Sequence, residues 1–290
     1  MAETGPLGGR LLVMYYRTHH DGGRYRSPLA LTARHTGLTD LVVGTVRLDT
    51  GGVVSLNSAL PGAPGPAPMW ADLAALREQG VRVLALLGGR RSFARLDHGF
   101  RTNYPPLKAF LRHYRLDGLD LRVPEPMSAG VTERLIDRLR ADFGADFVIS
   151  FAPTATELSG GSTPSALHYD RLYWSRGDEV DRFHVRMNGG GRDRTAAYER
   201  IVARGVIPPG KLVFSAPTSL SGSDDEILAG DELKTAVAGL LRRCPGFGGV
   251  AGWAYWEYVD ALADPTDEPW RWAQEMGAVL GLGAGRARGR

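Results

Sequence analysis

The sequence predicts a single α/β domain with the fold of a (β/α)₈ TIM barrel. Apolar runs that suit fully buried strands occur eight times in the 290 residues, and segments with helical spacing or turn residues separate them. This alternation is typical of a parallel sheet with helical crossovers. The hydrophobic content of 43% is sufficient for one large core, so we expect one domain.

The predicted strands are short, as expected for the inner wall of such a barrel. They are Leu11–Tyr16, Leu41–Val46, Val81–Leu87, Gly118–Val123, Phe147–Ala152, Phe183–Met187, Leu212–Ala216 and Val250–Tyr255.

The segments between these strands carry helical patterns. In Val131–Phe143 the apolar residues fall on one face, which predicts a surface helix. The ranges 69–76, 198–202 and 233–241 repeat the pattern, and glycines at 80, 144 and 205 stand where helix C-caps are expected. We expect a lead-in at 1–10, the barrel at 11–280, and a flexible tail rich in glycine and arginine at 281–290.

Composition argues against several classes of function. The net charge of +3 comes from scattered arginines without a basic stripe, so no nucleic-acid partner is expected. The first apolar run, Leu11–Tyr16, is too short for a signal segment or a membrane span. The single Cys244 has no disulfide partner and no metal-ligand spacing. We therefore expect a cytoplasmic protein without a membrane partner, and the oligomeric state stays open.

No motif for a cofactor or a metal is recognised. The glycine clusters lack the spacing of a phosphate loop. His19 and His20 are adjacent without a third spaced ligand, so neither a metal nor another cofactor is expected. In a barrel of this type the functional groups lie at the C-terminal ends of the strands, where we expect a small-molecule ligand.

The most informative stretch is the fourth predicted strand with the residues that flank it. Asp117, Gly118 and Asp120 match the motif D-G-x-D-x-D-x-E, in which the final glutamate ends the fourth strand. The segment resembles the signature of glycoside hydrolase family 18. Arg122 stands at the third aspartate of the motif, and Pro124 stands at the glutamate.

Further segments resemble the same family, in its chitinase-like and endo-β-N-acetylglucosaminidase-like members. They are Tyr15-Tyr16 with Thr18-His19, Leu87-Gly88-Gly89, Ala152-Pro153-Thr154-Ala155-Thr156 and Phe247-Gly248-Gly249-Val250-Ala251-Gly252-Trp253. Because these anchors occur in order over nearly the whole chain, the resemblance is more specific than one motif.

The resemblance implies a mechanism in which the glutamic acid protonates the glycosidic oxygen and the N-acetyl carbonyl of the substrate is the nucleophile. The preceding aspartate orients the acetamide, and a tyrosine on the sixth strand helps to hold it. Pro124 cannot donate a proton, and Arg122 reverses the charge beside the acetamide. Residues 185–189 resemble the sequence Gln-Phe-Tyr-Asn-Gly, which pairs Met187 with the tyrosine and Asn188 with the asparagine.

Five residues are candidates for a catalytic role. Asp120 and Arg122 share one strand face, either as an internal ion pair or as a clamp for an anion or enolate. Glu125 can replace the acid only if a bulge at Pro124 turns it inward, since neighbouring strand residues face opposite sides. Glu257 is either a replacement acid or a solvated loop residue, and Tyr15 lines the mouth.

Six residues are candidates for substrate binding: Tyr16, His19, Met187, Asn188, Trp253 and Tyr255. Trp253 is expected on the barrel floor, where it either stacks under a ligand or packs in the core. His19 is expected either to titrate near neutral pH or to belong to a polar loop. For Asp117 we expect a structural role, in which it binds backbone amides at the start of its strand.

Three hypotheses for function follow. The first is a repurposed intracellular enzyme that catalyses a cyclisation, isomerisation or elimination of a small metabolite in specialised metabolism. The second is a non-catalytic pseudo-glycosidase that binds a carbohydrate or a protein. The third is an altered N-acetylglucosaminidase or chitinase that uses Glu125 as its acid.

Overall fold

The structure is a computed structural model and describes residues 9–161, 165–187, 194–218, 230–255 and 268–282. Its centre is a closed barrel of eight parallel strands, in which the pairing of β1 with β4 closes the ring. The strands are β1 (Leu11–Tyr16), β4 (Asp40–Leu48), β6 (Arg82–Leu87), β7 (Gly118–Leu121), β8 (Val148–Phe151), β9 (Arg182–Arg186), β10 (Leu212–Pro217) and β11 (Gly249–Trp253).

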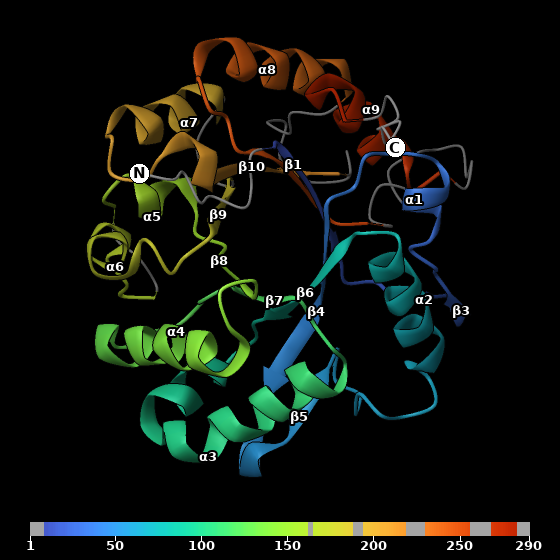
Figure 1. Cartoon of the computed structure of the whole chain (residues 1–290), viewed down its shortest axis with the longest axis vertical. Helices are drawn as coiled ribbons and strands as arrows, with labels where there is room; N and C mark the ends of the chain where they lie inside the picture. The colour runs from blue at the N-terminus through green and yellow to red at the C-terminus, as the bar shows by residue number, and fades with distance from the viewer. Residues whose placement is uncertain (1–8, 162–164, 188–193, 219–229, 256–267, 283–290) are drawn as a thin grey trace.

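Helices surround the strands, as Figure 1 shows. They are α1 (Ala30–Ala33), α2 (Ala67–Glu78), α3 (Ser92–His113), α4 (Ala129–Phe143), α5 (Ala155–Leu158), α6 (Tyr169–Arg176), α7 (Arg194–Ala203), α8 (Gly230–Arg243) and α9 (Arg271–Leu280), with short 3₁₀ turns η1 (Thr50–Gly52) and η2 (Pro209–Lys211). The predicted (β/α)₈ barrel is therefore confirmed, and each predicted strand overlaps one of the eight.

Three short strands were not predicted. β2 (His20–Asp21) and β3 (Arg24–Tyr25) form a small antiparallel hairpin after β1, and β5 (Val54–Leu56) adds to β4 in the antiparallel direction. The hairpin follows the C-terminal end of β1, and β5 lies beside the last residues of β4. None of the helices in the described ranges is long and apolar enough to cross a membrane.

Alternation along the strands produces two hydrophobic clusters. On β1, Leu11, Val13 and Tyr15 belong to the inner cluster, which fills the barrel. Leu12 and Tyr16 belong to the outer cluster, where the strands pack against the helices. Since successive strand residues face opposite sides, the same rule assigns a face to each site residue below.

A buried ion-pair cluster closes the N-terminal end of the barrel. Asp40, Arg82 and Arg182 are the first residues of β4, β6 and β9. The Asp40 carboxylate lies 2.8 Å from Nε of Arg82 and 3.0 Å from an amino nitrogen of Arg182. Burial alone raises the pKa of Asp40, but the two guanidinium charges prevail and hold it below its ordinary value. The cluster therefore places a charged layer at the base of the barrel.

Asp117 lies at the same end of the barrel, just before β7. Its Oδ2 accepts a hydrogen bond of 2.8 Å from the amide of Val83, and both carboxylate oxygens accept from Nε of Arg77. The structure thus agrees with the structural role expected for Asp117, which ties the start of β7 to β6.

Candidate functional site

A hydrogen-bonded group of four side chains occupies the barrel interior toward the C-terminal ends of the strands. Asp120 of β7 accepts hydrogen bonds from the Tyr15 hydroxyl at 2.8 Å and from the Ser150 hydroxyl at 2.6 Å. Nδ1 of His184, on β9, lies 2.8 Å from the Tyr15 oxygen and 3.2 Å from Oδ1 of Asp120. All four residues have 0% exposure. We call Tyr15, Asp120, Ser150 and His184 the inner network.

The donors and acceptors of this network fix the position of one proton. The single hydroxyl hydrogen of Tyr15 points to Asp120, so the Tyr15 oxygen is an acceptor toward His184. Nδ1 of His184 therefore carries a hydrogen. Nε2 of the same ring is buried and has no hydrogen-bond partner among the described residues.

The pKa values of two members shift in opposite directions. Burial raises the pKa of Tyr15 well above its ordinary value, and the adjacent Asp120 charge raises it further. For Asp120, burial alone raises the pKa, but His184 and the hydroxyls of Ser150 and Tyr15 prevail and lower it. The network therefore holds a neutral phenol against an ionised carboxylate.

A ring of cationic side chains lies one level closer to the strand ends. Arg17, Arg122 and Arg186 each follow a network member by two residues on the same strand or its extension, which places them on the same face. Cζ of Arg17 lies 4.9 Å from the centre of the Trp253 ring, and Cζ of Arg122 lies 5.2 Å from it. We call these three arginines the arginine cluster.

Trp253 connects the arginine cluster with the inner network. Its ring centre lies 4.4 Å from that of Tyr15, and it packs against the inner cluster while remaining partly exposed. Nε of Arg186 donates a 2.9 Å hydrogen bond to the carbonyl of Ala152, which fixes that side chain beside β8. Trp253 therefore packs in part against the core, as one of the two expectations had it, and its stacking under a ligand stays a prediction.

Solved structures resemble this chain over nearly its whole length. A fungal endo-β-N-acetylglucosaminidase of glycosyl hydrolase family 18 is 34% identical, over 93% of this chain and 98% of the other, with a TM-score of 0.85. The chain belongs to glycosyl hydrolase family 18. The chitinase ChiC from Aspergillus fumigatus is 33% identical over 93% of this chain and 99% of the other, with a TM-score of 0.82.

A more distant family 18 chitinase, from Pseudoalteromonas aurantia, shares the fold at 15% identity and a TM-score of 0.69, over 93% of this chain and 99% of the other. No model of a protein family matches the sequence, and no curated protein matches it. The resemblance expected from the sequence is confirmed at the level of the family.

In this family 18 barrel, the position of the motif glutamate lies at the open end. Pro124 is exposed, and it stands on the inner-facing side of the alternation that runs through Asp120 and Arg122. Among the described residues Arg122 forms no ion pair with Asp120, whose partners are the inner network. The expected internal ion pair is therefore absent, because Tyr15, Ser150 and His184 already surround the carboxylate.

The Glu125 carboxylate is bound at the start of a neighbouring helix. It accepts hydrogen bonds from the backbone amides of Arg91 at 2.7 Å, Phe93 at 3.0 Å and Ala94 at 3.1 Å. These amides are among the unsatisfied donors of the first turn of α3, where a negative charge is favourable. The Glu125 carboxylate therefore points to the start of α3, and the catalytic role considered for this residue does not fit its position.

The sixth-strand pairing proposed from sequence is shifted by one residue. Met187 has 1% exposure and lies with Val185 in the outer cluster, whereas His184 and Arg186 face the interior. Strand alternation requires this, because residues one apart face opposite sides. Met187 therefore does not bind a ligand in the interior. Arg186 occupies the inward position that the sequence comparison had assigned to Met187.

Tyr16 and Tyr255 do not line the strand ends either. Both lie in the outer cluster with at most 1% exposure. Their hydroxyls donate to the carbonyls of Arg26 and Ser27, at 2.7 and 3.0 Å, and so fasten the segment after β3. The prediction that they bind substrate is wrong because both sit on outward-facing positions.

His19 is also a buried residue that packs against a neighbouring ring. It has 8% exposure, its ring centre lies 4.6 Å from that of Tyr16, and burial lowers its pKa to about 4. It is therefore uncharged at neutral pH, which argues against the first of the two alternatives considered for it, titration near neutral pH. Two other predicted residues, Asn188 and Glu257, lie outside the described residues.

Sequence reasoning missed three interior residues, namely Ser150, His184 and Arg186. The signal for two of them is visible in Arg182-Phe183-His184-Val185-Arg186, where basic and apolar residues alternate through a buried strand. Such an alternation places all basic side chains on one face. Within the described ranges, no three side chains of His, Cys, Asp or Glu are placed to hold one metal ion.

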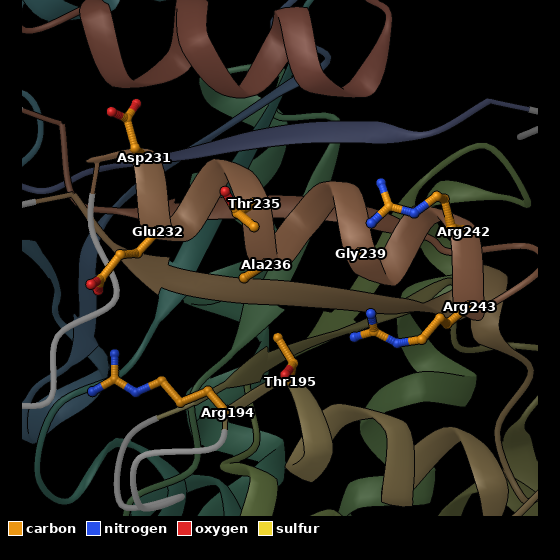
Figure 2. Close-up of a pocket in the computed structure, with 9 residues that line it drawn as sticks. All are labelled: Arg194, Thr195, Asp231, Glu232, Thr235, Ala236, Gly239, Arg242 and Arg243. Atoms are coloured by element: carbon orange, nitrogen blue, oxygen red, sulfur yellow. The ribbon is translucent and has the colours of Figure 1, made fainter.

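A separate groove lies between α7 and α8, outside the barrel (Figure 2). Asp231 and Glu232 stand in the first turn of α8, and Arg242 and Arg243 stand in the last, so these charges complement the helix dipole. Arg243 also pairs with Glu199 at 2.6 Å. Helix stability thus accounts for the charges that α8 contributes to this groove.

Proposed function

We propose that this family 18 barrel is a non-hydrolytic enzyme that acts on a small metabolite at its strand ends. The observation that carries the proposal is the position of Arg122. It lies over Trp253, on the inner face, at the place of the aspartate that orients the substrate acetamide. The proton donor expected two residues later is Pro124.

Hydrolysis by the family mechanism needs a carboxylic acid that can reach the glycosidic oxygen. Pro124 has no proton to give, and the Glu125 carboxylate is engaged by three amides of α3. Asp120 is the described carboxylate of the inner network, and its lowered pKa keeps it ionised near neutral pH. None of the three is suited to act as the acid.

The acetamide of an amino sugar also lacks its partner. An aspartate accepts a hydrogen bond from the acetamide N–H, whereas a guanidinium has donors only. The family substrate presents the N–H donor of its acetamide on this side. Arg122, with Arg186 nearby, offers no acceptor for that donor. The guanidinium donors favour a carbonyl oxygen on which negative charge develops.

This preference defines the reaction class. Guanidinium groups that are already in place stabilise an enolate or another oxyanion without reorganisation, which lowers the barrier of a cyclisation, an isomerisation or an elimination. Trp253 offers the flat apolar surface on which a small ring or chain would lie. The enzyme that we propose is cytoplasmic, binds a small-molecule ligand and acts in specialised metabolism.

A non-catalytic binding protein is the second candidate, and one observation favours it. Tyr15, Asp120 and His184 have 0% exposure, so the groups best suited to move protons lie beneath Trp253 and the arginine cluster. In a binding protein these three residues would only support the wall of the site.

The test begins with hydrolysis. We expect no cleavage of chitin oligosaccharides or of the chitobiose core of an N-glycan, under conditions in which an active family 18 chitinase digests its substrate completely. Cleavage by the purified protein that is lost in Glu125→Gln would overturn the proposal and restore the altered glycosidase.

Restoring the family residues is the complementary experiment. The combined variant Arg122→Asp, Pro124→Glu and Arg186→Tyr places an acid, an aspartate and a tyrosine at inward positions. Its matched control carries Met187→Tyr in place of Arg186→Tyr and so puts the tyrosine outside. Hydrolysis by the first variant alone would show that the scaffold is intact and that these positions abolish the family reaction.

Enzyme and binding protein are separated by isotope incorporation. A metabolite extract is incubated with the protein in deuterium oxide, and products are followed by mass spectrometry. An enzyme produces a new or deuterated compound that the Arg122→Met variant does not produce. A compound that is retained by the protein but recovered unchanged supports the binding protein.

A further inference from the structure

The arginine cluster concentrates positive charge at one place. Arg17 and Arg122 both approach the Trp253 ring, and the charges of Arg17 and Arg186 both act on Arg122. Arg17, Arg122 and Arg186 are all partly exposed at the end of the barrel where the strands terminate. Two cations therefore lie against one aromatic ring, and a third acts on Arg122.

Asp120 offsets part of this charge from one level below. Asp120 does not neutralise Arg122 directly, because its two oxygens accept from Tyr15 and Ser150 and contact His184. In the described part of the chain, the Arg122 guanidinium has a contact with Trp253 and no ion pair.

Keeping cations together in a partly buried place is unfavourable without an anion. Burial, followed by the charges of Arg186 and Arg17, lowers the pKa of Arg122 from its ordinary value. A lowered pKa means that the surroundings of Arg122 disfavour its positive charge. An anion between the guanidinium groups would remove this cost, and arginine provides paired N–H donors that match carboxylate and phosphate oxygens.

We propose that the strand ends bind a small organic oxyanion, held by Arg122 and Arg186 and stacked on Trp253. The inference rests on the proposed function, since it names the substrate class of the same site. A phosphate monoester and a dicarboxylate share this chemistry. A neutral amino sugar lacks it and would leave the charge of Arg122 without an anion.

Calorimetric titration with defined probes tests this. The probes are inorganic phosphate, malonate, and N-acetylglucosamine 6-phosphate beside neutral N-acetylglucosamine. We expect a dianion to bind with a Kd on the order of 1 mM or below, and the neutral sugar to bind at least tenfold more weakly. Preference for the phosphates or for malonate identifies the source of the oxyanion. Raising the salt concentration to about 0.5 M should weaken binding, since screening acts on exposed charges.

Variants locate the site. Arg122→Met and Arg186→Met remove one charge each and should weaken dianion binding on the order of tenfold or more. Arg122→Lys keeps the charge without the paired donors and should fall between wild type and Arg122→Met. The matched control is Arg101→Met, on the exposed face of α3, which removes the same charge far from the strand ends and should change binding less than about twofold. Thermal melting curves establish that each variant is folded.

Two outcomes would overturn the inference: no dianion binds up to about 10 mM, or Arg122→Met and Arg101→Met bind equally well. Either outcome leaves the proposed function standing, provided that amino-sugar oligomers are not cleaved. Cleavage of those oligomers refutes the proposed function whatever the anion titration gives.

Discussion

The Tyr15 hydroxyl donates a 2.8 Å hydrogen bond to Oδ2 of Asp120, and both side chains have 0% exposure. The two residues are 105 positions apart and come from β1 and β7. Their contact therefore depends on closure of the barrel. A carboxylate in this interior is tolerated only while its hydrogen-bond partners remain in place.

Tyr15→Phe should destabilise the protein by about 1 to 3 kcal/mol, because it leaves a buried carboxylate oxygen and Nδ1 of His184 without their shared partner. The measurement is the free energy of unfolding in urea. Tyr104→Phe is the matched control, since it removes a 2.8 Å hydrogen bond to Asp142, a carboxylate that is less buried and also binds Lys108. An equal or larger loss in Tyr104→Phe would contradict the importance given to the inner network.

Glu125→Gln should lower the free energy of unfolding by about 1 to 2 kcal/mol, because the carboxylate serves three amides in the first turn of α3. Glu78→Gln is the control. Glu78 is exposed at the end of α2, and its loss should change stability by less than about 0.5 kcal/mol. Equal stability of the two variants would show that Glu125 does not cap α3.

The sequence was sufficient for the fold and for part of the site. The apolar runs predicted the strands because a buried parallel strand is apolar on both faces, and the motif around Asp120 correctly placed Asp120 and Arg122 on one face. Helix α3 was not predicted, since Gly99 interrupts its dihedral angles and Pro105 and Pro106 lie within it. Such residues are normally read as helix breakers.

The remaining errors have two physical causes. Residue identity alone paired Met187 with the family tyrosine, whereas the side that a residue faces depends on strand register, which placed Arg186 inside. The partners of Glu125 were not predictable because they are backbone amides more than 30 positions earlier, brought close where the segment after β7 meets the start of α3. Residue identity does not show which backbone amides will donate to a distant side chain.

His19 should make stability depend on pH between about 6.5 and 4. Burial lowers its pKa from 6.5 to about 4, so in this range the unfolded chain binds a proton that the folded chain does not. Stability is therefore complete above pH 6.5 and falls as the pH decreases to 4, by about 3 kcal/mol at most.

The check compares the free energy of unfolding of wild type and His19→Gln across this pH range. The difference between them should shrink or reverse toward pH 4, since the variant has no such proton to bind. His98→Gln, at an exposed position of α3, should follow the wild-type curve. Parallel curves for wild type and His19→Gln would contradict the burial of a neutral ring.

Asp40→Asn should destabilise the barrel by about 3 to 5 kcal/mol, because it leaves the fully buried Arg182 without the carboxylate that lies 3.0 Å away. The folded-state pKa of Asp40 is lowered, so its contribution is present above its unfolded value of 3.8 and is lost as the pH falls below it. The variant should lack this acid-dependent loss.

Adding Arg182→Met to Asp40→Asn tests the cause. If the damage comes from an unpaired buried cation, the double variant is more stable than Asp40→Asn alone, because it removes that cation. Arg82→Met is the control second change, since the Arg82 side chain is 28% exposed and water can solvate its charge. Strictly additive losses in urea unfolding would instead show that Asp40 and Arg182 act independently.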